Sequence, residues 1–271
     1  MEIQETINIQ PPASIYGTFS RYSYKIWYAI AEFVDNSTSS FYKNERSLKF
    51  YHQDKLVVDI EYDPTENVLR ITDNAFGMEI QDFRRAILLD AKPENNDGRN
   101  EFGMGLKTAA SWFGKVWSVT STQLGSQNKY TATVDIPHLE KEKTNNVDIY
   151  KMKANPSEHG TVIEIKQLTK RPDGPRTIGK IKDILRSMYR RDLDSGKVEI
   201  RYNHEILTFE KYHILCSGDK EWRKNLDFYF NYDGIHHVTG FVALLGEGKN
   251  RDSGSYPLAG FALFRRNRVV I

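Results

Sequence analysis

The feature that most constrains this chain is the order of three short blocks in which acids, amides and glycines adjoin apolar segments. The first block is Glu32–Ser37 (EFVDNS), the second is Asp73–Met78 (DNAFGM), and the third is Gly98–Lys107 (GRNEFGMGLK). A Gly160-Thr161 pair begins a later apolar run. No block is specific by itself, but the set suits binding of a nucleotide and its attack by water.

The first block lies on a predicted helix between Tyr24 and Tyr42. Apolar residues repeat there with the helical period: Trp27, Ile30, Val34 and Phe41. Glu32 and Asn36 are one turn apart on the opposite side, and Ser39 follows them. A carboxylate can orient and deprotonate water, and an amide oxygen can complete an Mg²⁺ shell. Taken alone, this turn is better explained as a solvated helix face with a chance acid and amide.

The second block follows two predicted strands, Leu56–Tyr62 and Val68–Thr72, which the sequence joins into a hairpin. Asp73 ends the second strand, and Gly77 allows the backbone to approach a flat ligand closely. A buried carboxylate at this point could accept a hydrogen bond from an exocyclic amino group such as that of adenine. An ordinary strand-to-turn Asp and Gly is the alternative reading.

The third block precedes a predicted helix at Leu106–Phe113. Four backbone N–H groups would face an anion at its start, those of Gly103, Met104, Gly105 and Leu106. Lys107 could add a positive charge. A Walker loop needs glycine directly before its lysine, and the dinucleotide fingerprint needs a third glycine where Thr108 stands, so neither motif fits.

Further elements alternate in the manner of a mixed layer with one helical face. The predicted helices are Gln81–Leu89 and a segment whose apolar stripe is Ile178, Ile181, Leu185, Met188 and Tyr189. The predicted strands are Val116–Ser121, Tyr130–Ile136, Thr161–Lys166, Val198–Tyr202, Asp227–Tyr232, Val238–Leu245 and Phe261–Ile271. The prolines and glycine of Arg171–Pro175 indicate a linker, which predicts domains at 1–170 and 171–271.

Composition narrows the setting of the protein. At 271 residues the chain exceeds one average domain, and its net charge of +2 does not imply a polyanionic partner. Cys216 is the single cysteine, which excludes an intrachain disulfide and a cysteine zinc site. No run approaches the ~20 apolar residues that span a bilayer. We expect a soluble, cytoplasmic protein without a membrane partner.

A basic face is predicted on the helix that follows the linker. Lys182, Arg186 and Arg190 recur there at helical spacing, away from the apolar stripe. Such a face could neutralise phosphates of DNA without reading its sequence. A solvated helix face is the equally open alternative.

In this order, the blocks resemble the four nucleotide-binding boxes of the gyrase, Hsp90, histidine kinase and MutL (GHKL) superfamily. The boxes correspond to Glu32/Asn36, Asp73/Gly77, Gly103/Gly105 and Gly160/Thr161, and the resemblance covers roughly residues 14–166. It implies an α+β fold, a Bergerat-type two-layer α/β sandwich that binds ATP with Mg²⁺.

The resemblance also implies a role for each matching residue. Glu32 would be the general base, Asn36 the metal ligand, and Asp73 the adenine reader with a water bridged to Thr161. Gly77 and Met78 would line the base pocket. The segment that would close over the triphosphate as a lid is Gly103, Met104, Gly105, Leu106 and Lys107 with the loop before it.

Within the superfamily, three segments look most like bacterial MORC-type ATPases. They are Ala31–Ser37, Glu101–Lys107 and Phe264–Val269. The last is similar to a strand of a ribosomal-S5-like transducer domain, just before a loop whose lysine reaches the γ-phosphate. The chain ends inside an apolar run, so we expect this second domain to be partial and hydrolysis by the chain to be slow.

Two positions depart from the family pattern. Ala75 occupies the place of the first glycine of the second box, so its backbone must avoid positive φ. Ser39 stands where many relatives carry a second acid. Neither change touches the expected base or metal ligand.

The expected activity is ATP hydrolysis coupled to lid closure and to a nucleotide-dependent homodimer, in a clamp or switch of the MORC or Hsp90 kind. A histidine kinase is a poorer fit, since the first histidine, His52, lies after the first box. A nucleotide-sensing module, switched by ATP or ADP occupancy without turnover, stays open as the alternative.

Overall fold

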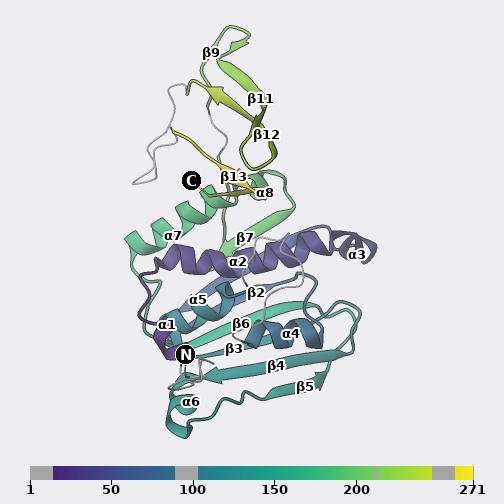
Figure 1. The fold of residues 1–271 in the computed structure, drawn as a ribbon, viewed down its shortest axis with the longest axis vertical. Coiled ribbons are helices and arrows are strands. Elements are labelled where there is room, and N and C mark those ends of the chain that lie inside the picture. The colour runs from purple at the N-terminus through teal and green to yellow at the C-terminus, as the bar shows by residue number, and fades with distance from the viewer. Residues whose placement is uncertain (1–14, 89–102, 211–212, 246–259, 271) are drawn as a thin grey trace, which may run out of the picture.

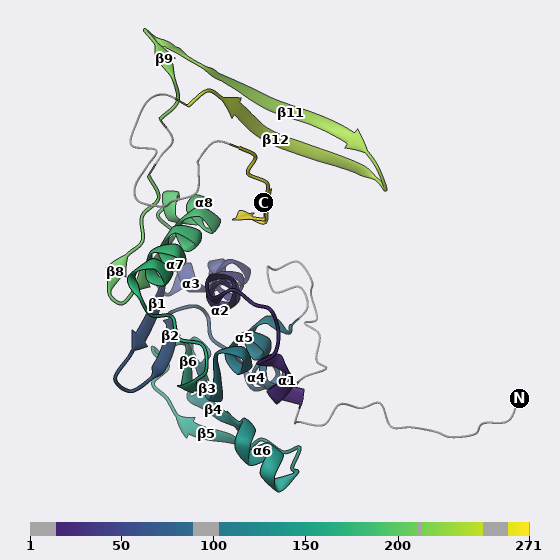
Figure 2. The same ribbon diagram turned by 90° about the vertical axis from the view of Figure 1, so that its left-hand side faces the viewer.

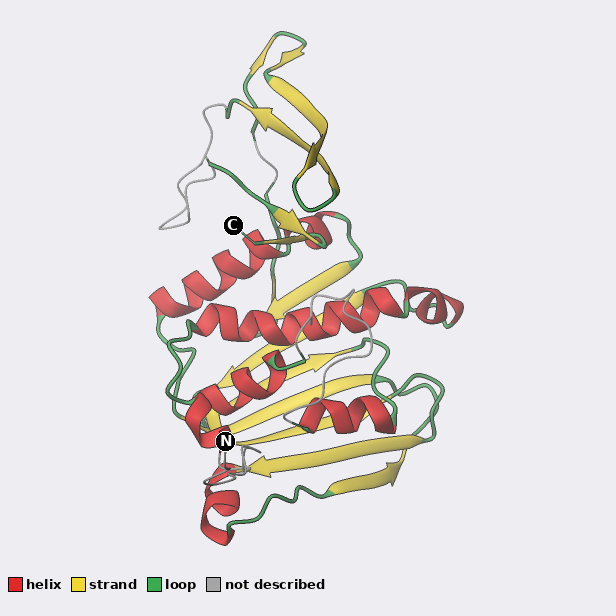
Figure 3. Cartoon of the chain, in the orientation of Figure 1, coloured by secondary structure: helices red, strands yellow, loops and turns green. Residues whose placement is uncertain are grey.

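The computed structural model describes residues 15–88, 103–210, 213–245 and 260–270. Their main feature is an eight-stranded sheet with the order β5-β4-β3-β6-β2-β1-β7-β8. Helices α1, α2, α4 and α5 lie on one side of its strands (Figure 1), as a view turned by 90° shows (Figure 2). The two-layer α+β architecture predicted from the sequence is therefore confirmed, with helices on one face (Figure 3).

The helical layer is built around α2 (Ile26–Lys43), which follows the short α1 (Ile15–Phe19) and precedes α3 (Glu45–Phe50). The predicted stripe of Ile30, Val34 and Phe41 is buried. Burial also extends over the other sides of α2. Between residues 29 and 41 the side chains that keep partial exposure are Glu32, Asn36, Ser39 and Ser40. The helix thus leaves one polar stripe open.

The sheet forms from the predicted strands. Its central members are β1 (Leu56–Asp63), β2 (Val68–Asp73), β3 (Gly114–Thr122), β4 (Asn128–Asp135) and β6 (Gly160–Leu168), and every neighbouring pair among them is antiparallel. Alternate side chains point into the helical layer, where Trp117 and Ile165 are fully buried. Helices α4 (Ile80–Ile87) and α5 (Gly105–Phe113) pack above them.

The elements at this side of the sheet that were not predicted include α6 (Ile136–Glu142) and the edge strand β5 (Ile149–Lys153). The strand predicted to run through Ile136 ends one residue earlier, at Asp135. The Asp135 carboxylate accepts a hydrogen bond from the backbone N–H of His138 at 3.0 Å, and a proline stands in the first turn. These are helix-start signals.

The sheet continues past the boundary predicted after residue 170. Gly174 and Pro175 begin α7 (Pro175–Met188), so the helix breakers start a helix here. After α8 (Arg190–Asp194), strand β7 (Val198–Tyr202) pairs in parallel with β1, and β8 (Glu205–Ile206) forms the sheet edge. Residues on both sides of 170/171 thus contribute strands to one sheet, and the division into two domains stays a prediction.

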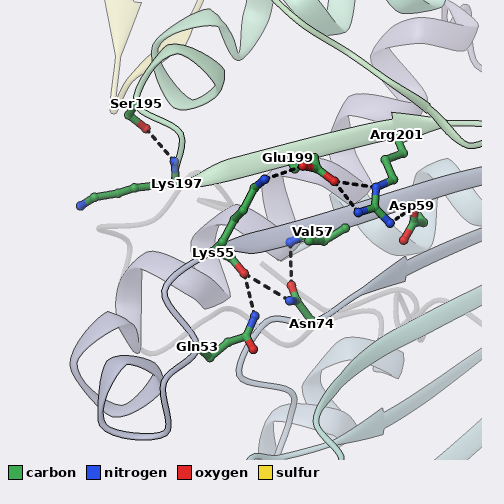
Figure 4. A network of polar contacts seen from close by, with 9 residues as sticks. All are labelled: Gln53, Lys55, Val57, Asp59, Asn74, Ser195, Lys197, Glu199 and Arg201. Atoms are coloured by element: carbon green, nitrogen blue, oxygen red, sulfur yellow. Dashed lines mark hydrogen bonds and ion pairs between the residues drawn. The ribbon is translucent and has the colours of Figure 1, made fainter.

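Polar contacts reinforce the pairing of β1 with β7 (Figure 4). Lys55 forms an ion pair with Glu199, and Arg201 joins Glu199 to Asp59 across the two strands. Asn74, from the second block, accepts a hydrogen bond from the backbone N–H of Val57 at 2.6 Å. The turn that carries Asp73 is thereby tied to the start of β1.

The remaining described elements are β-hairpins. They are β9 (Cys216–Ser217) with β10 (Lys220–Glu221), β11 (Arg223–Asn231) with β12 (Ile235–Ala243), and β13 (Phe264–Arg265) with β14 (Arg268–Val269). The single strand predicted at Phe261–Ile271 is wrong, because the chain reverses at Arg266 and Asn267. Both have positive φ, +52° and +64°, as a tight hairpin turn requires.

The β11–β12 hairpin stands apart from the main sheet (Figure 2). No helix in the described part of the chain is long and apolar enough to cross a membrane.

We expect Leu185→Ala to destabilise the whole sheet unit, because Leu185 is fully buried in α7 and α7 packs on α2. Truncation of a buried leucine costs about 2–5 kcal/mol. The test is urea unfolding in a Trp222→Phe background, so that fluorescence reports Trp27, Trp112 and Trp117. Arg176→Ala, an exposed change in the same helix, is the control. An unchanged midpoint for Leu185→Ala would contradict a shared unit.

Candidate functional site

Glu32 lies where α2 meets the start of α5. Its Oε1 accepts a hydrogen bond from the Tyr24 hydroxyl at 3.1 Å. Its Oε2 lies against Gly105, since a Cβ at that position would overlap the carboxylate. Burial, followed by the charge and hydrogen bond of Glu32, raises the pKa of Tyr24 well above its ordinary value. Tyr24 therefore stays protonated and donates to Glu32 across the physiological range.

Asn36 lies one turn further along the same open stripe. Its Nδ2 is buried and has no hydrogen-bond partner among the described residues. A buried amide group without a partner is costly unless a ligand completes its hydrogen bonds. No set of three or more His, Cys, Asp or Glu side chains in the described ranges could hold a metal ion. An ion at Asn36 would therefore take its other ligands from phosphate oxygens and water.

Asp73 is the centre of a second cluster, at the end of β2. Its Oδ2 accepts a hydrogen bond from the Ser37 hydroxyl at 2.7 Å. Its Oδ1 accepts from the backbone N–H groups of Ala75 and Thr161, at 3.0 and 3.1 Å. Burial raises the pKa of the Asp73 carboxyl, and these hydrogen bonds oppose the shift. The carboxylate is thus partly desolvated and held by three donors.

The turn after Asp73 needs a glycine at Gly77, the fifth residue of the second block. Gly77 has φ +78°, and a Cβ there would overlap the carbonyl oxygen of Thr122. Met78 follows, and its backbone N–H donates to the Ser121 hydroxyl at 3.0 Å. Ala75 is buried and is not among the residues with positive φ, as its substitution for glycine requires. The block therefore closes without strain at Ala75.

Thr161 contacts Asp73 through its backbone. The two residues are register partners in the β2–β6 pair. The Thr161 hydroxyl lies 3.0 Å from that of Ser121. At Gly160, φ is +113° and a Cβ would overlap the backbone of Asp73, so the Gly-Thr pair allows β6 to approach the carboxylate closely. The water between Asp73 and Thr161 stays a prediction.

The third block begins α5, and its residues from Gly98 to Phe102 lie outside the described part of the chain. Gly103 has φ +65°, and the side chain of Met104, the N-cap residue, makes no capping hydrogen bond in the part of the chain that the structure describes. The N–H groups of this turn are therefore available to an anion. Leu106 is buried beside them.

Lys107 takes a different place from the one expected. Its side chain is fully buried, and its ammonium donates to the backbone carbonyl of Leu88, at the end of α4. Burial lowers the pKa of Lys107 to about 8. The positive charge expected beside an anion is thus directed at a backbone oxygen in this structure.

The basic face predicted on α7 is largely neutralised within the chain. Lys182 and Arg186 both pair with Glu205, and Arg186 also contacts Asp183. Arg190 is buried. Their ion pairs involve Glu205 and Asp183 and none of the predicted site residues.

Three contributors to the site were missed in the sequence. Ser37 could have been found, because it follows Asn36 directly and faces the same end of the sheet. Tyr24 and Ser121 carried no such signal, since their roles depend on the contact of elements distant in sequence. Together the clusters bring an acid, an amide and a helix start within one region.

A sequence model of the family described as histidine kinase-, DNA gyrase B-, and HSP90-like ATPase matches residues 24–173. This range includes every predicted site residue. A comparison with curated proteins found no match.

We expect Gly77→Ala to destabilise the protein, since left-handed φ alone costs an L-residue roughly 1–2 kcal/mol and the Thr122 carbonyl would have to move. Gly179→Ala is the matched control. Gly179 lies within α7 with open space around it, so alanine there should stabilise by about 0.5–1 kcal/mol. Thermal unfolding of both variants checks the opposite signs. Equal melting temperatures would contradict the tight turn.

Proposed function

Because the chain belongs to the family of histidine kinase-, DNA gyrase B- and HSP90-like ATPases, whose domain binds ATP, we propose that it binds ATP with Mg²⁺ and hydrolyses it slowly. The observation that carries the proposal is the convergence on α2 of Glu32, which lies against Gly105 at the start of α5, of Asn36, and of Asp73, which Ser37 binds. Each group supplies a different part of the chemistry.

Glu32 acts as the general base. Its carboxylate accepts a proton from the water that attacks the γ-phosphorus, and Tyr24 holds the carboxylate by donating to Oε1. Gly105 lets the start of α5 approach the same carboxylate without a side chain between them. This contact brings the base close to the end of the helix that would bind the phosphates.

Asn36 holds the metal through its amide oxygen. Mg²⁺ bound there supplies charge neutralisation to the phosphates. The amide oxygen fits this role because Mg²⁺ prefers oxygen ligands, and the amide nitrogen, which has no hydrogen-bond partner among the described residues, can donate to a phosphate oxygen. The site provides one protein ligand, so metal binding would depend on the nucleotide.

Asp73 reads adenine by accepting a hydrogen bond from its exocyclic amino group. Ser37 and the N–H groups of Ala75 and Thr161 occupy part of the carboxylate and fix its orientation. Gly77 and Met78 line the base. A partly desolvated acceptor strongly disfavours a base without the amino group, which would leave the carboxylate short of a donor.

The start of α5 holds the phosphates. The N–H groups of Gly103, Met104, Gly105 and Leu106 face the anion at the positive end of the helix dipole. For Lys107 to contact a phosphate, its ammonium must leave the carbonyl of Leu88. We therefore assign lid closure to a rearrangement of this segment on nucleotide binding.

Lid closure in turn drives a nucleotide-dependent homodimer, in a clamp or switch of the MORC or Hsp90 kind. The β11–β14 segments belong to a second, S5-like domain in this proposal. DNA held in such a clamp would contact other surfaces than the α7 face, because Lys182 and Arg186 pair with Glu205. A reducing, cytoplasmic setting fits the single exposed Cys216.

We expect Glu32→Gln to retain ATP binding and to lower phosphate release by 10²–10⁴-fold, roughly the contribution of a general base. Asn36→Ala should instead weaken Mg-ATP binding, because it removes the metal ligand. Calorimetry and a phosphate-release assay separate the two effects, and Glu66→Gln in an exposed turn is the control. Unchanged release by Glu32→Gln would remove the base. ATP binding without release in the unsubstituted protein would support the nucleotide-sensing module.

On acidification, the affinity for ATP should begin to fall at a higher pH than it would with an aspartate of ordinary pKa, because burial raises the pKa of Asp73. Acidification has the opposite effect on the contribution of Asp73 to the stability of the fold. The folded state holds this proton more tightly than the unfolded state, so the contribution of Asp73 to stability falls as pH rises through the same window. Fluorescent-nucleotide titration against pH measures the affinity. Asp73→Asn should bind weakly without this dependence, whereas Asp54→Asn should behave like the unsubstituted protein.

A further inference from the structure

The β13–β14 hairpin contacts the helix of the nucleotide site through one buried ion pair. Arg268 of β14 places its Nη1 3.0 Å from Oδ2 of Asp35 on α2. Asp35 is 2% exposed, and its other oxygen accepts a hydrogen bond from the Tyr189 hydroxyl at 2.9 Å. The same hydroxyl lies 2.9 Å from the carbonyl of Ala31. Three elements that are distant in sequence therefore meet at one carboxylate.

A second contact holds the other strand of the hairpin. The ring of Phe264 on β13 lies under two guanidinium groups, those of Arg191 at 3.9 Å and Arg190 at 4.8 Å. Both arginines follow the end of α7. The hairpin is thus docked by an ion pair to α2 and by cation–π contacts to α8.

Asp35 is embedded in the first block. It follows Glu32 by three residues and precedes Asn36 directly, so all three share one turn of α2. Any rotation or shift of this turn that breaks the contact of Asp35 with Arg268 also moves the base and the metal ligand. A displacement of about 1 Å at a catalytic group is enough to cost a large factor in rate.

The charge of Arg268 also reaches the site. Burial disfavours the charged guanidinium, but interactions with Tyr189, Asp35 and Glu32 outweigh it and raise the pKa of Arg268. The guanidinium is therefore a permanent positive charge beside the helix turn that carries the base. Removing it would leave Asp35 buried without its cation, which destabilises the local arrangement strongly.

We propose that Arg268 is a positioning residue of the nucleotide site, which couples the place of the C-terminal hairpin to the orientation of Glu32 through Asp35. This inference rests on the proposed function. It adds a route by which movement of residues 260–270 changes the activity of a site whose other described parts lie between residues 24 and 161. By linkage, nucleotide binding must then also change the stability of the docked hairpin.

The test compares Arg268→Gln, Arg268→Lys, Asp35→Asn and the double variant D35N/R268Q with the unsubstituted protein. Arg266→Gln, an exposed change in the turn of the same hairpin, is the control. For each protein we would measure ATP affinity by calorimetry, phosphate release at saturating ATP, and hydrogen–deuterium exchange of residues 29–36 and 263–270 with and without a nonhydrolysable ATP analogue.

Arg268→Gln should lower kcat about tenfold and also raise the KM for ATP, because the displaced turn carries both the base and the metal ligand. Arg268→Lys should recover part of the rate. The double variant should lose no more than either single variant, since both remove one interaction. In the hydrogen–deuterium exchange experiment, the ATP analogue should slow exchange of residues 263–270 in the unsubstituted protein and in Arg266→Gln, but not in Arg268→Gln.

Several results would overturn the inference. Normal kcat and normal exchange in Arg268→Gln would do so, as would additive losses in the double variant. If the unsubstituted protein releases no phosphate, hydrolysis as the function fails, and the exchange response to the analogue decides the coupling. If it binds no ATP, the proposed function fails as a whole. In that case, hydrogen–deuterium exchange of residues 29–36 without nucleotide tests the coupling of the hairpin to α2. Equal exchange rates of these residues in Arg268→Gln and in Arg266→Gln would refute the coupling.

Discussion

The enclosure of α2 is the constraint on which the rest of this structure depends. Apolar side chains bury the helix against the sheet, and α5 and α7 cover further sides of it. Between residues 29 and 41, what remains open is a stripe less than three turns long that carries Glu32 and Asn36. A rigid, mostly buried helix can hold two polar groups at a constant separation, which a surface helix or a loop cannot do as well. The burial of α2 therefore fixes the positions of Glu32 and Asn36.

Three carboxylates on or near this stripe differ in the residues that surround them. Glu32 has a protonated tyrosine and a glycine beside it and stays partly open. Asp35 is fully enclosed and paired with Arg268. The hydrogen bonds of Asp73 described above come from three neutral donors and from no cation. Burial raises the pKa of this carboxyl. The three acids therefore occupy three different environments: Glu32 is partly open, Asp35 is buried and paired with a cation, and Asp73 is held by neutral donors.

The described residues after 212 differ from the sheet unit in their packing. The register of β11 and β12 places Leu226, Phe228 and Phe230 on one face of a two-stranded hairpin, and much of that face is exposed in the described residues. A two-stranded ribbon gains little burial by itself. The smaller β13–β14 hairpin, by contrast, reaches the helical layer through Arg268 and Phe264. Contact between this region and the site thus passes through a few side chains.

The sequence by itself determined most helices and strands of the sheet unit, and it indicated the family. The 3.6-residue period marked α2 and its polar stripe, alternation marked β1, β2, β3 and β6, and the order of the blocks indicated the family. Only the tertiary structure decided that β7 joins β1, that Lys107 turns to Leu88, and that Arg268 meets Asp35. The physical reason is range. Periodicity and capping depend on neighbours within a few residues, whereas these contacts depend on which distant surfaces the packed sheet and helices bring together.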